Sequence, residues 1–160
     1  MNSKNIIFNW DENTGIASCL ITDNKDNTFF GISKCHPEDR DMMNEYTGYN
    51  IAYNRALLKA LRFHRDNELL LRYKTLKQFY YTINHSQQFN KNSYETKMLK
   101  RQIQLAQDDL NSIKELINET KTELLNYIHD KDKFYNKIRD LRKVKSFEEE
   151  HNNSQIFTET

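Results

Sequence analysis

The chain has 160 residues, with 24 basic and 23 acidic side chains and a formal net charge of +1. This balance excludes a global electrostatic attraction to nucleic acids or membranes, so binding of either kind would need a local patch. Hydrophobic residues make up 37% of the chain, which is a thin core for a globule but suits a solvated helical arm. The scarcity of glycine (3) and proline (1) favours long uninterrupted helices.

The N-terminal part predicts three β-strands joined by short polar turns. We expect strands over residues 5–10, 16–22 and 28–35, where β-forming residues are frequent. The first turn ends in Gly15, which can adopt a positive φ. The short connections predict an antiparallel meander, and a sheet of this size needs a helix on one face to be stable.

The segment that follows links the sheet to the helical part of the chain. Pro37 suits the first position of a short helical turn. We expect the chain to break again near Thr47 and Gly48, with Thr47 as the N-cap of the next helix.

Two long amphipathic helices are predicted after this junction. The first covers residues 49–83, and Arg62, Arg65 and Glu68 interrupt its apolar stripe. The second runs from residue 93 to about residue 145 and begins near Asn92, in a capping-box-like pattern. Its seam follows a heptad spacing of four and three. The seam positions are Leu99, Ile103, Ala106, Leu110, Ile113, Ile117, Thr120, Leu124, Tyr127, Lys131, Phe134, Ile138 and Leu141.

The short connection at residues 85–91 predicts that these helices form an antiparallel hairpin. Counting outward from it sets Leu58 level with Asn118, so residues beyond about Lys131 run past the start of the first helix. They must then pack on the sheet, pair with another chain or stay exposed. Because Phe134, Ile138 and Leu141 keep the apolar spacing, we do not expect exposure.

The predicted fold class is therefore α+β, a three-stranded antiparallel sheet followed by a long antiparallel helical hairpin, or coiled coil. Residues 1–45 form the β-meander and junction, and residues 46–145 form the hairpin. Residues 146–160 are acidic and polar and predict a flexible tail.

The two cysteines do not predict a catalytic pair or a disulfide. Cys35 and His36 are adjacent, so on a strand they point to opposite faces and make a poor nucleophile–base pair. The expected strand pairing sets Cys19 opposite Gly31 and Cys35 near Gly15, out of disulfide reach.

No motif in the sequence predicts a cofactor or a metal. The group His36, Glu38, Asp39 and Asp41 matches neither zinc nor calcium spacing, and a capped helix start explains its acids equally well. A Gly-rich phosphate loop and the common hydrolase motifs are absent from the sequence. We therefore predict that the chain is not an enzyme and uses neither a cofactor nor a metal.

Aromatic residues gather where the two predicted helices meet. Tyr80 belongs to the apolar stripe, whereas Phe79 and Tyr81 point elsewhere. They either enlarge a small core at this end or form an exposed contact patch, and aromatic residues commonly anchor protein interfaces. The candidate protein-binding residues are Phe79, Tyr81, Phe89 and Tyr94.

Basic residues gather in two stretches, one on each predicted helix. Such clusters can hold phosphates, but on long helices they more often form a solvated face. The stretch on the first helix contains Lys59, Arg62, Arg65, Arg72, Lys74 and Lys77. The candidate nucleic-acid-binding residues on the second helix are Lys133, Lys137, Arg139, Arg142, Lys143 and Lys145.

The sheet-to-helix junction resembles a pattern in small uncharacterised proteins of phages of low-GC Gram-positive bacteria. It consists of Gly31-Ile-Ser-Lys-Cys-His-Pro-Glu-Asp39, then Thr47-Gly48, Ile51-Ala52 and Arg55-Ala56. The likeness covers about residues 16–56 and implies a phage origin without a known activity. In physical terms, Gly48 would let the chain turn, and Ala52 and Ala56 would let the helix lie close to the sheet.

These features together predict a phage-type interaction protein in the cytoplasm of a host bacterium. We expect it to bind a host or viral protein, and to inhibit or redirect a host enzyme or defence complex. One alternative is a nucleic-acid-binding accessory protein that uses the basic end of the second helix. The other is a structural homodimer in which the seam beyond Lys131 pairs between chains. The sequence predicts no signal peptide and no membrane segment.

Overall fold

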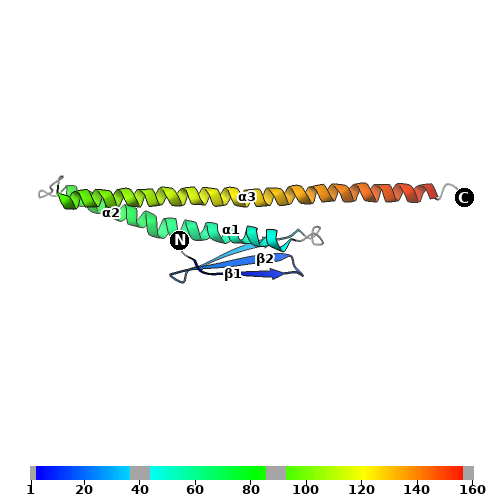
Figure 1. The fold of residues 1–160 in the computed structure, drawn as a ribbon, viewed down its shortest axis with the longest axis horizontal. Coiled ribbons are helices and arrows are strands. Elements are labelled where there is room, and N and C mark those ends of the chain that lie inside the picture. Colours follow the sequence, from blue (N-terminus) through cyan, green and yellow to red (C-terminus); the bar gives the residue numbers. More distant parts are fainter. Residues whose placement is uncertain (1–2, 37–43, 86–92, 157–160) are drawn as a thin grey trace.

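The computed structural model describes the backbone of residues 3–36, 44–85 and 93–156, and it confirms an α+β fold (Figure 1). Strands β1, β2 and β3 form an antiparallel sheet in the order β1-β2-β3. The helical elements follow the sheet in the chain. The bounds are β1 Ser3–Asp11, β2 Ile16–Asp23, β3 Thr28–Lys34, α1 Glu45–His64, η2 Arg65–Leu69, α2 Leu70–Asn84 and α3 Tyr94–Ile156.

The strand register agrees with the sequence prediction. Cys19 lies opposite Gly31, and the backbone N–H of Cys35 donates to the carbonyl oxygen of Gly15 over 2.9 Å. Gly15 has a φ of 64°, as expected for the end of this turn. Cys19 is buried and Cys35 is half-buried, and both are free thiols.

Helix α1 covers one face of the sheet through a row of alanines. Ala52, Ala56 and Ala60 recur every fourth residue and are fully buried. Small side chains let the helix approach β2 and β3 closely, which confirms the role expected for the first two alanines. The sheet side of this core consists of Ala17, Cys19, Ile21 and Phe29.

The predicted break at the start of α1 is wrong. The helix begins at Glu45, and the side chain of Asn44 accepts a hydrogen bond from the backbone N–H of Thr47, so Asn44 is the N-cap. Gly48 lies within the first turns of the helix. A Cβ at Gly48 would lie 2.9 Å from the Cβ of Ala17, so close packing on the sheet, not a turn, requires glycine here. Residues 37–43, which include Pro37, lie outside the described residues.

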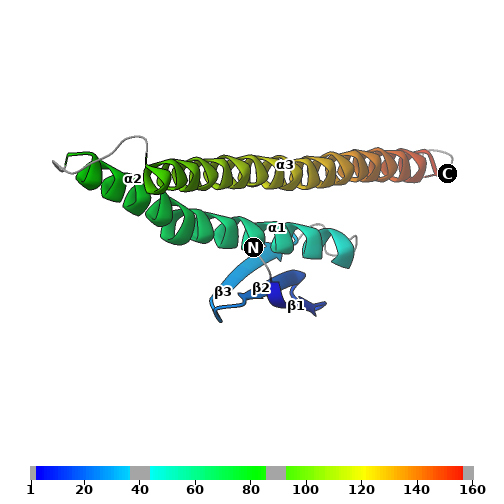
Figure 2. The ribbon, with the colours of Figure 1, turned by 60° about the vertical axis from the view of Figure 1, so that its left-hand side comes forward.

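Helix α3 lies alongside α1, η2 and α2 (Figures 1 and 2). Leu58 and Leu61 of α1 pack with Ile113 and Ile117 of α3 in a second apolar cluster, separate from the core under α1. Leu69 and Leu124 border this cluster. The seam predicted for α3 is therefore buried on its central turns.

A π-helical turn, η2, lies where the predicted apolar stripe is interrupted. Arg65 and Glu68, which break the stripe, both belong to this turn. A π-turn contains one residue more than an α-helical turn. The extra residue shifts the following side chains around the helix axis, so that Leu69 again packs toward α3. The interruption in the sequence therefore marks a change of helix geometry.

Beyond Lys131, the seam of α3 behaves only partly as predicted. Tyr135 is buried in a small pocket that Trp10 of the sheet and Thr47 of α1 also line. Phe134 is 55% exposed, so the expectation that it would be covered is wrong. Tyr135, the next residue along α3, is the one that packs against the sheet, whereas Phe134 lines a neighbouring pocket with Thr47 and stays largely exposed.

The helical backbone of α3 extends to Ile156, through much of the segment for which the sequence predicts a flexible tail. The sequence contains neither glycine nor proline after Gly48, so no residue interrupts the helix on conformational grounds. Residues 157–160 lie outside the described residues.

Candidate functional site

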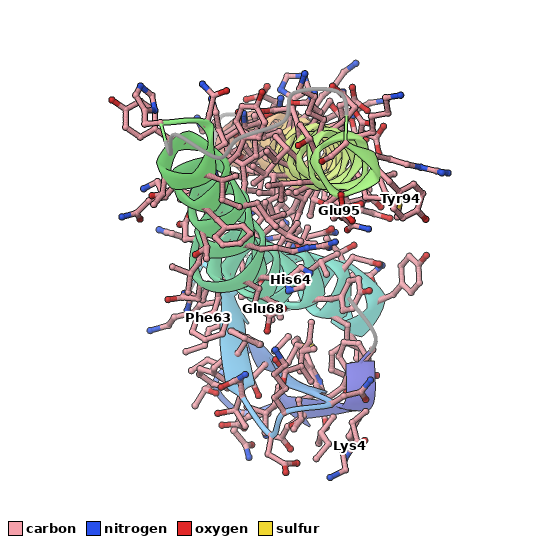
Figure 3. All side chains as sticks on the ribbon, turned by 90° about the vertical axis from the view of Figure 1, so that its left-hand side faces the viewer. Lys4, Phe63, His64, Glu68, Tyr94 and Glu95 are labelled. Atoms are coloured by element: carbon pink, nitrogen blue, oxygen red, sulfur yellow. The ribbon has the colours of Figure 1, made fainter. Side chains whose placement is uncertain are left out.

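Three aromatic side chains are exposed at the end of the molecule where α2 stops and α3 starts. Phe79 is 55% exposed, Tyr81 64% and Tyr94 73%. Figure 3 looks at this end and shows the Tyr94 ring projecting outward from α3. We call Phe79, Tyr81 and Tyr94 the aromatic end. Phe89, the fourth predicted residue, lies outside the described residues.

Local contacts order the helix termini that carry the aromatic end. The Tyr81 ring lies 4.0 Å from the His85 ring between centroids, and His85 Nδ1 lies 2.8 Å from the carbonyl oxygen of Tyr81. Helix α3 is capped by Ser93, whose Oγ accepts from the backbone N–H of Thr96 over 3.2 Å. The pKa of Glu95 is lowered by a hydrogen bond from its own backbone N–H and by a second hydrogen bond from the side chain of Ser93.

The exposure of Phe79 and Tyr81 bears on the two interpretations that the sequence left open. In a tip core, Phe79 and Tyr81 would be covered, but both are exposed in the described structure. Tyr80, between them, is half-buried, and Lys100 of α3 lies 5.9 Å from its ring centroid. Of these three consecutive aromatic residues, Tyr80 therefore lies toward α3, and Phe79 and Tyr81 are exposed.

The basic stretch on the first helix is largely engaged within the chain. Lys59 Nζ donates to the carbonyl oxygen of Phe30 over 2.6 Å. Arg72 pairs with Asp109 of α3 at 3.3 Å, and Lys77 lies over the Tyr73 ring. Such internal contacts argue against a continuous phosphate-binding face on this helix.

The basic end of α3 is more open but interleaved with acids. Lys133, Lys137, Arg142 and Lys143 are exposed. Arg139 is half-buried and its Nη1 donates to Asn136 Oδ1 over 3.3 Å. The side chain of Lys145 lies outside the described side chains. The structure therefore places most of the candidate nucleic-acid-binding residues on one stretch of helix.

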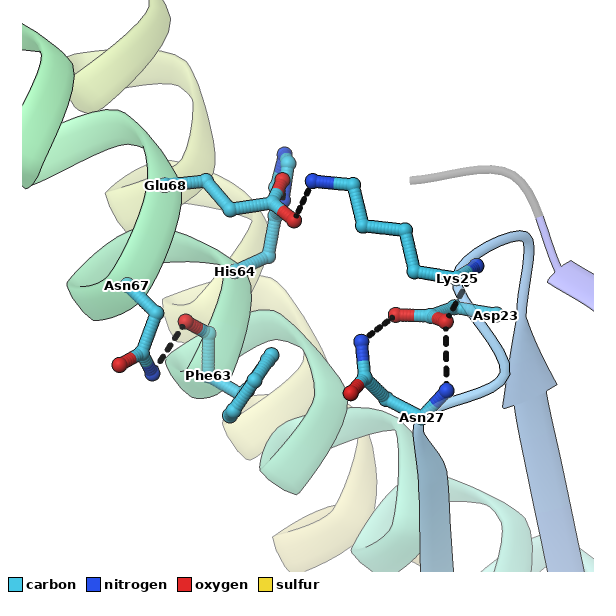
Figure 4. A network of polar contacts seen from close by, with 7 residues as sticks. All are labelled: Asp23, Lys25, Asn27, Phe63, His64, Asn67 and Glu68. Carbon is cyan, nitrogen blue, oxygen red and sulfur yellow. Dashed lines mark hydrogen bonds and ion pairs between the residues drawn. The ribbon is translucent and has the colours of Figure 1, made fainter.

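A polar network that the sequence did not predict ties the sheet to the π-turn (Figure 4). Lys25, in the β2–β3 turn, donates to Glu68 of η2, and His64 Nδ1 contacts the other carboxylate oxygen of Glu68. Asp23 holds the turn by accepting from the backbone N–H groups of Lys25 and Asn27 over 2.8 and 2.9 Å. The interruption by Glu68 in the apolar stripe was the only sequence signal of this network.

Hydrogen bonding sets the pKa values of both carboxylates in this network. The side chain of Asn27 donates to Asp23 over 2.9 Å and lowers the pKa of that carboxyl group. The hydrogen bond from Lys25 is the main cause of the lowered pKa of Glu68, and the charge of His64 adds to it. The network is therefore a stabilising contact between sheet and helix, and it brings no nucleophile next to a base.

Within the described ranges, no three metal-binding side chains gather in one place. Over the same ranges, no helix combines the length and apolar character needed to cross a bilayer. Glu38, Asp39 and Asp41 of the weighed metal cluster fall outside the described residues.

Comparisons with protein-family models, curated proteins and solved structures found no match to this chain. The resemblance of the junction to phage proteins therefore stays a prediction.

Proposed function

We propose that the chain is a non-catalytic binding protein whose helices form an antiparallel coiled-coil arm that presents the aromatic end to another protein. The observation that carries the proposal is that Phe79, Tyr81 and Tyr94 are all exposed at the end of the molecule where α2 stops and α3 starts.

The coiled-coil part of the proposal is supported by the burial pattern of α3. Ala106, Leu110, Ile113, Ile117 and Thr120 are buried, at the alternating spacings of four and three that define a seam. Because α1, η2 and α2 lie along this seam, each helix stiffens the other. A stiff arm holds its end in one geometry, which reduces the ordering cost of binding.

The protein-binding part of the proposal is supported by the chemistry of the aromatic end. Large rings with few rotatable bonds give a large contact area at a small entropy cost, and Tyr and Trp are enriched in interface hot spots. Tyr81 and Tyr94 add hydroxyl groups that can bond polar partners at the rim. Charged side chains near the aromatic end, such as those of Lys77 and Lys97, would form a polar rim around the contact with the partner.

The class of partner rests on the junction resemblance. A phage origin would make a host protein the target, and we propose inhibition or redirection of a host enzyme or defence complex in the bacterial cytoplasm.

The test is affinity purification from host cells with a triple variant of the aromatic end, Phe79→Ser, Tyr81→Ser and Tyr94→Ser. The matched control is Leu71→Ser with Leu125→Ser, which removes similarly exposed apolar side chains from α2 and α3. We expect the wild type and the control to retain the same protein and the triple variant to lose it. Equal recovery by all three, or no reproducible partner, would contradict the proposal.

The second candidate function is nucleic-acid binding by the basic end of α3. It is favoured by the exposure of Lys133, Lys137, Arg142 and Lys143 on consecutive turns. A salt series of gel shifts with the wild type and with Arg139→Glu, Arg142→Glu and Lys143→Glu separates the candidates. Binding that weakens with salt and disappears in this variant would support nucleic-acid binding over protein binding.

A further inference from the structure

The two edges of the sheet differ in how they are protected. The backbone N–H of Cys35 donates to Gly15, on the side of β2. Because backbone groups alternate in direction along a strand, every second residue of β3 bonds to β2 in the same way. The residues between them, which include Phe30 and Ile32, direct their backbone groups to the outer edge of β3. Lys59 donates to the carbonyl oxygen of Phe30 over 2.6 Å, and Arg55 to that of Ile32 over 2.5 Å. Two side chains of α1 therefore block the β3 edge against another strand.

The opposite edge, β1, has no such guard in the described part of the chain. No described side chain bonds to its backbone from Ile6 to Trp10. Helix α1 packs on β2 and β3 and touches β1 little, and β1 lies at the margin of the sheet (Figure 2). An unprotected edge strand is a template for pairing with a further strand.

The side chains of β1 are apolar on both faces of the sheet. Ile7 lies opposite Leu20 on the face away from α1, and it is 51% exposed. Ile6 and Phe8 point to the α1 side, where Phe8 contacts the Tyr49 ring at 5.1 Å, yet both remain exposed. A paired strand would cover all three residues at once.

The geometry points to a second copy of this chain as that strand: we propose that two molecules pair antiparallel through their β1 edges about a two-fold axis at Ile7. Two-fold antiparallel pairing sets residues of the same face opposite one another. With the axis at Ile7, Ile7 faces the partner's Ile7 and Ile6 faces the partner's Phe8. Both are apolar pairs of the kind that stabilises sheets.

Neighbouring registers are worse. An axis at Ile6 sets Phe8 opposite the partner's Lys4 and Ile7 opposite the partner's Asn5. An axis at Phe8 sets Ile7 opposite the partner's Asn9 and Asn5 opposite the partner's Asp11. With the axis at Ile7, by contrast, the three central pairs are apolar and Asn5 lies opposite the partner's Asn9. Only Lys4, opposite the partner's Trp10, then pairs a polar with an apolar side chain. The segment is therefore most self-complementary in the register with its axis at Ile7. This inference does not depend on the function proposed for the aromatic end.

The test compares Ile7→Lys with Ile32→Lys by sedimentation equilibrium. Both residues are exposed on the same face of the sheet, at 51% and 43%, but Ile32 belongs to the guarded edge. We expect a dimer for the wild type and for Ile32→Lys, and a dissociation constant at least about tenfold higher for Ile7→Lys, in which two like charges face each other. Circular dichroism should show the same fold in all three.

A cysteine at the two-fold axis gives the second measurement. Ile7→Cys in a Cys35→Ser background should form a disulfide between chains, because opposed Cα atoms of an antiparallel pair lie within disulfide reach. Ile32→Cys in the same background should not. A wild type that is monomeric at high micromolar concentration would overturn the proposal. The proposal would also be overturned by a dimer whose dissociation constant does not change in Ile7→Lys and whose Ile7→Cys variant forms no disulfide between chains. Such a dimer would use another surface, such as α3.

Discussion

A Cβ atom built on Gly31 would lie 2.0 Å from the carbonyl oxygen of Ala52, across the contact between β3 and α1. The same atom would lie 2.6 Å from the backbone nitrogen of Ala56. Since both neighbours are backbone atoms of a helix, neither can move aside alone. Gly31 therefore allows α1 to pack closely on the sheet.

Gly31→Ala should lower the free energy of unfolding by about 3 kcal/mol or more, because the methyl group forces α1 off the sheet. Urea denaturation followed by circular dichroism measures this. Gly48→Ala is the control: its methyl group would press on the side chain of Ala17, and the gain in helix propensity, about 1 kcal/mol, offsets part of the cost. Equal stability of Gly31→Ala and the wild type would show that the contact is looser than described.

Asn54→Leu should raise the free energy of unfolding by about 1–2 kcal/mol. Asn54 is 2% exposed, and its Nδ2 donates to the carbonyl oxygen of Asn50, but its Oδ1 has no hydrogen-bond partner in the described structure. Replacing an unsatisfied buried amide by an apolar group of similar size removes that desolvation cost. Thermal and urea unfolding would check it, with Asn50→Leu as the control at a less buried position. A less stable Asn54→Leu protein would show that the amide makes a bond that the structure lacks.

Glu68→Gln should destabilise the protein more near pH 5.5 than near pH 2.5. Hydrogen bonding by Lys25 holds the pKa of Glu68 below the ordinary value of about 4.3. A carboxyl group whose pKa is lowered in the folded state stabilises it above the unfolded pKa, and this is lost as pH falls through the folded pKa.

The measurement for Glu68 is the melting temperature as a function of pH. We expect Glu68→Gln to lower it by about 2 °C at the higher pH and by less at the lower pH. Glu119→Gln, at an exposed position on α3, is the control and should show no such trend. A pH-independent difference for Glu68→Gln would mean that its ion pair with Lys25 contributes nothing in solution.

Removing the guard of the β3 edge should cause association beyond a dimer. Arg55→Ala with Lys59→Ala frees the carbonyl oxygens of Ile32 and Phe30, so a second edge becomes available for pairing. Light scattering should then increase with time and concentration. Arg62→Ala with Lys74→Ala removes the same charge from exposed helix positions and should leave scattering unchanged. Identical behaviour of the two double variants would assign any association to lost charge.

The sequence predicted the elements whose signals are local. Gly15 and the polar turns marked the hairpins, and the four-and-three spacing marked the seam of α3. Gly48 was misread because a glycine required by close packing looks the same in sequence as a glycine required by a turn. The burial of Asn54 and Tyr135 was not predicted. Asn54 is polar and Tyr135 stands among basic residues in the sequence, so residue type alone suggests that both are exposed.

The candidate surfaces were predictable to different degrees. The aromatic end was visible in the sequence as surplus aromatics beside a seam residue, but its exposure required the structure. The contrast between the two sheet edges was invisible, since it depends on where Arg55 and Lys59 reach in space. The network of Lys25, His64 and Glu68 joins residues far apart in the chain, and only the fold brings them together.

The central claim is that the aromatic end contacts a protein partner, and site-specific photo-cross-linking in host cells tests it most directly. A photoreactive phenylalanine analogue is placed at Tyr81 or, as the control, at the similarly exposed Leu125. The account predicts a discrete cross-linked protein from position 81 and none from position 125. No adduct at position 81, or the same adduct from both positions, would contradict it.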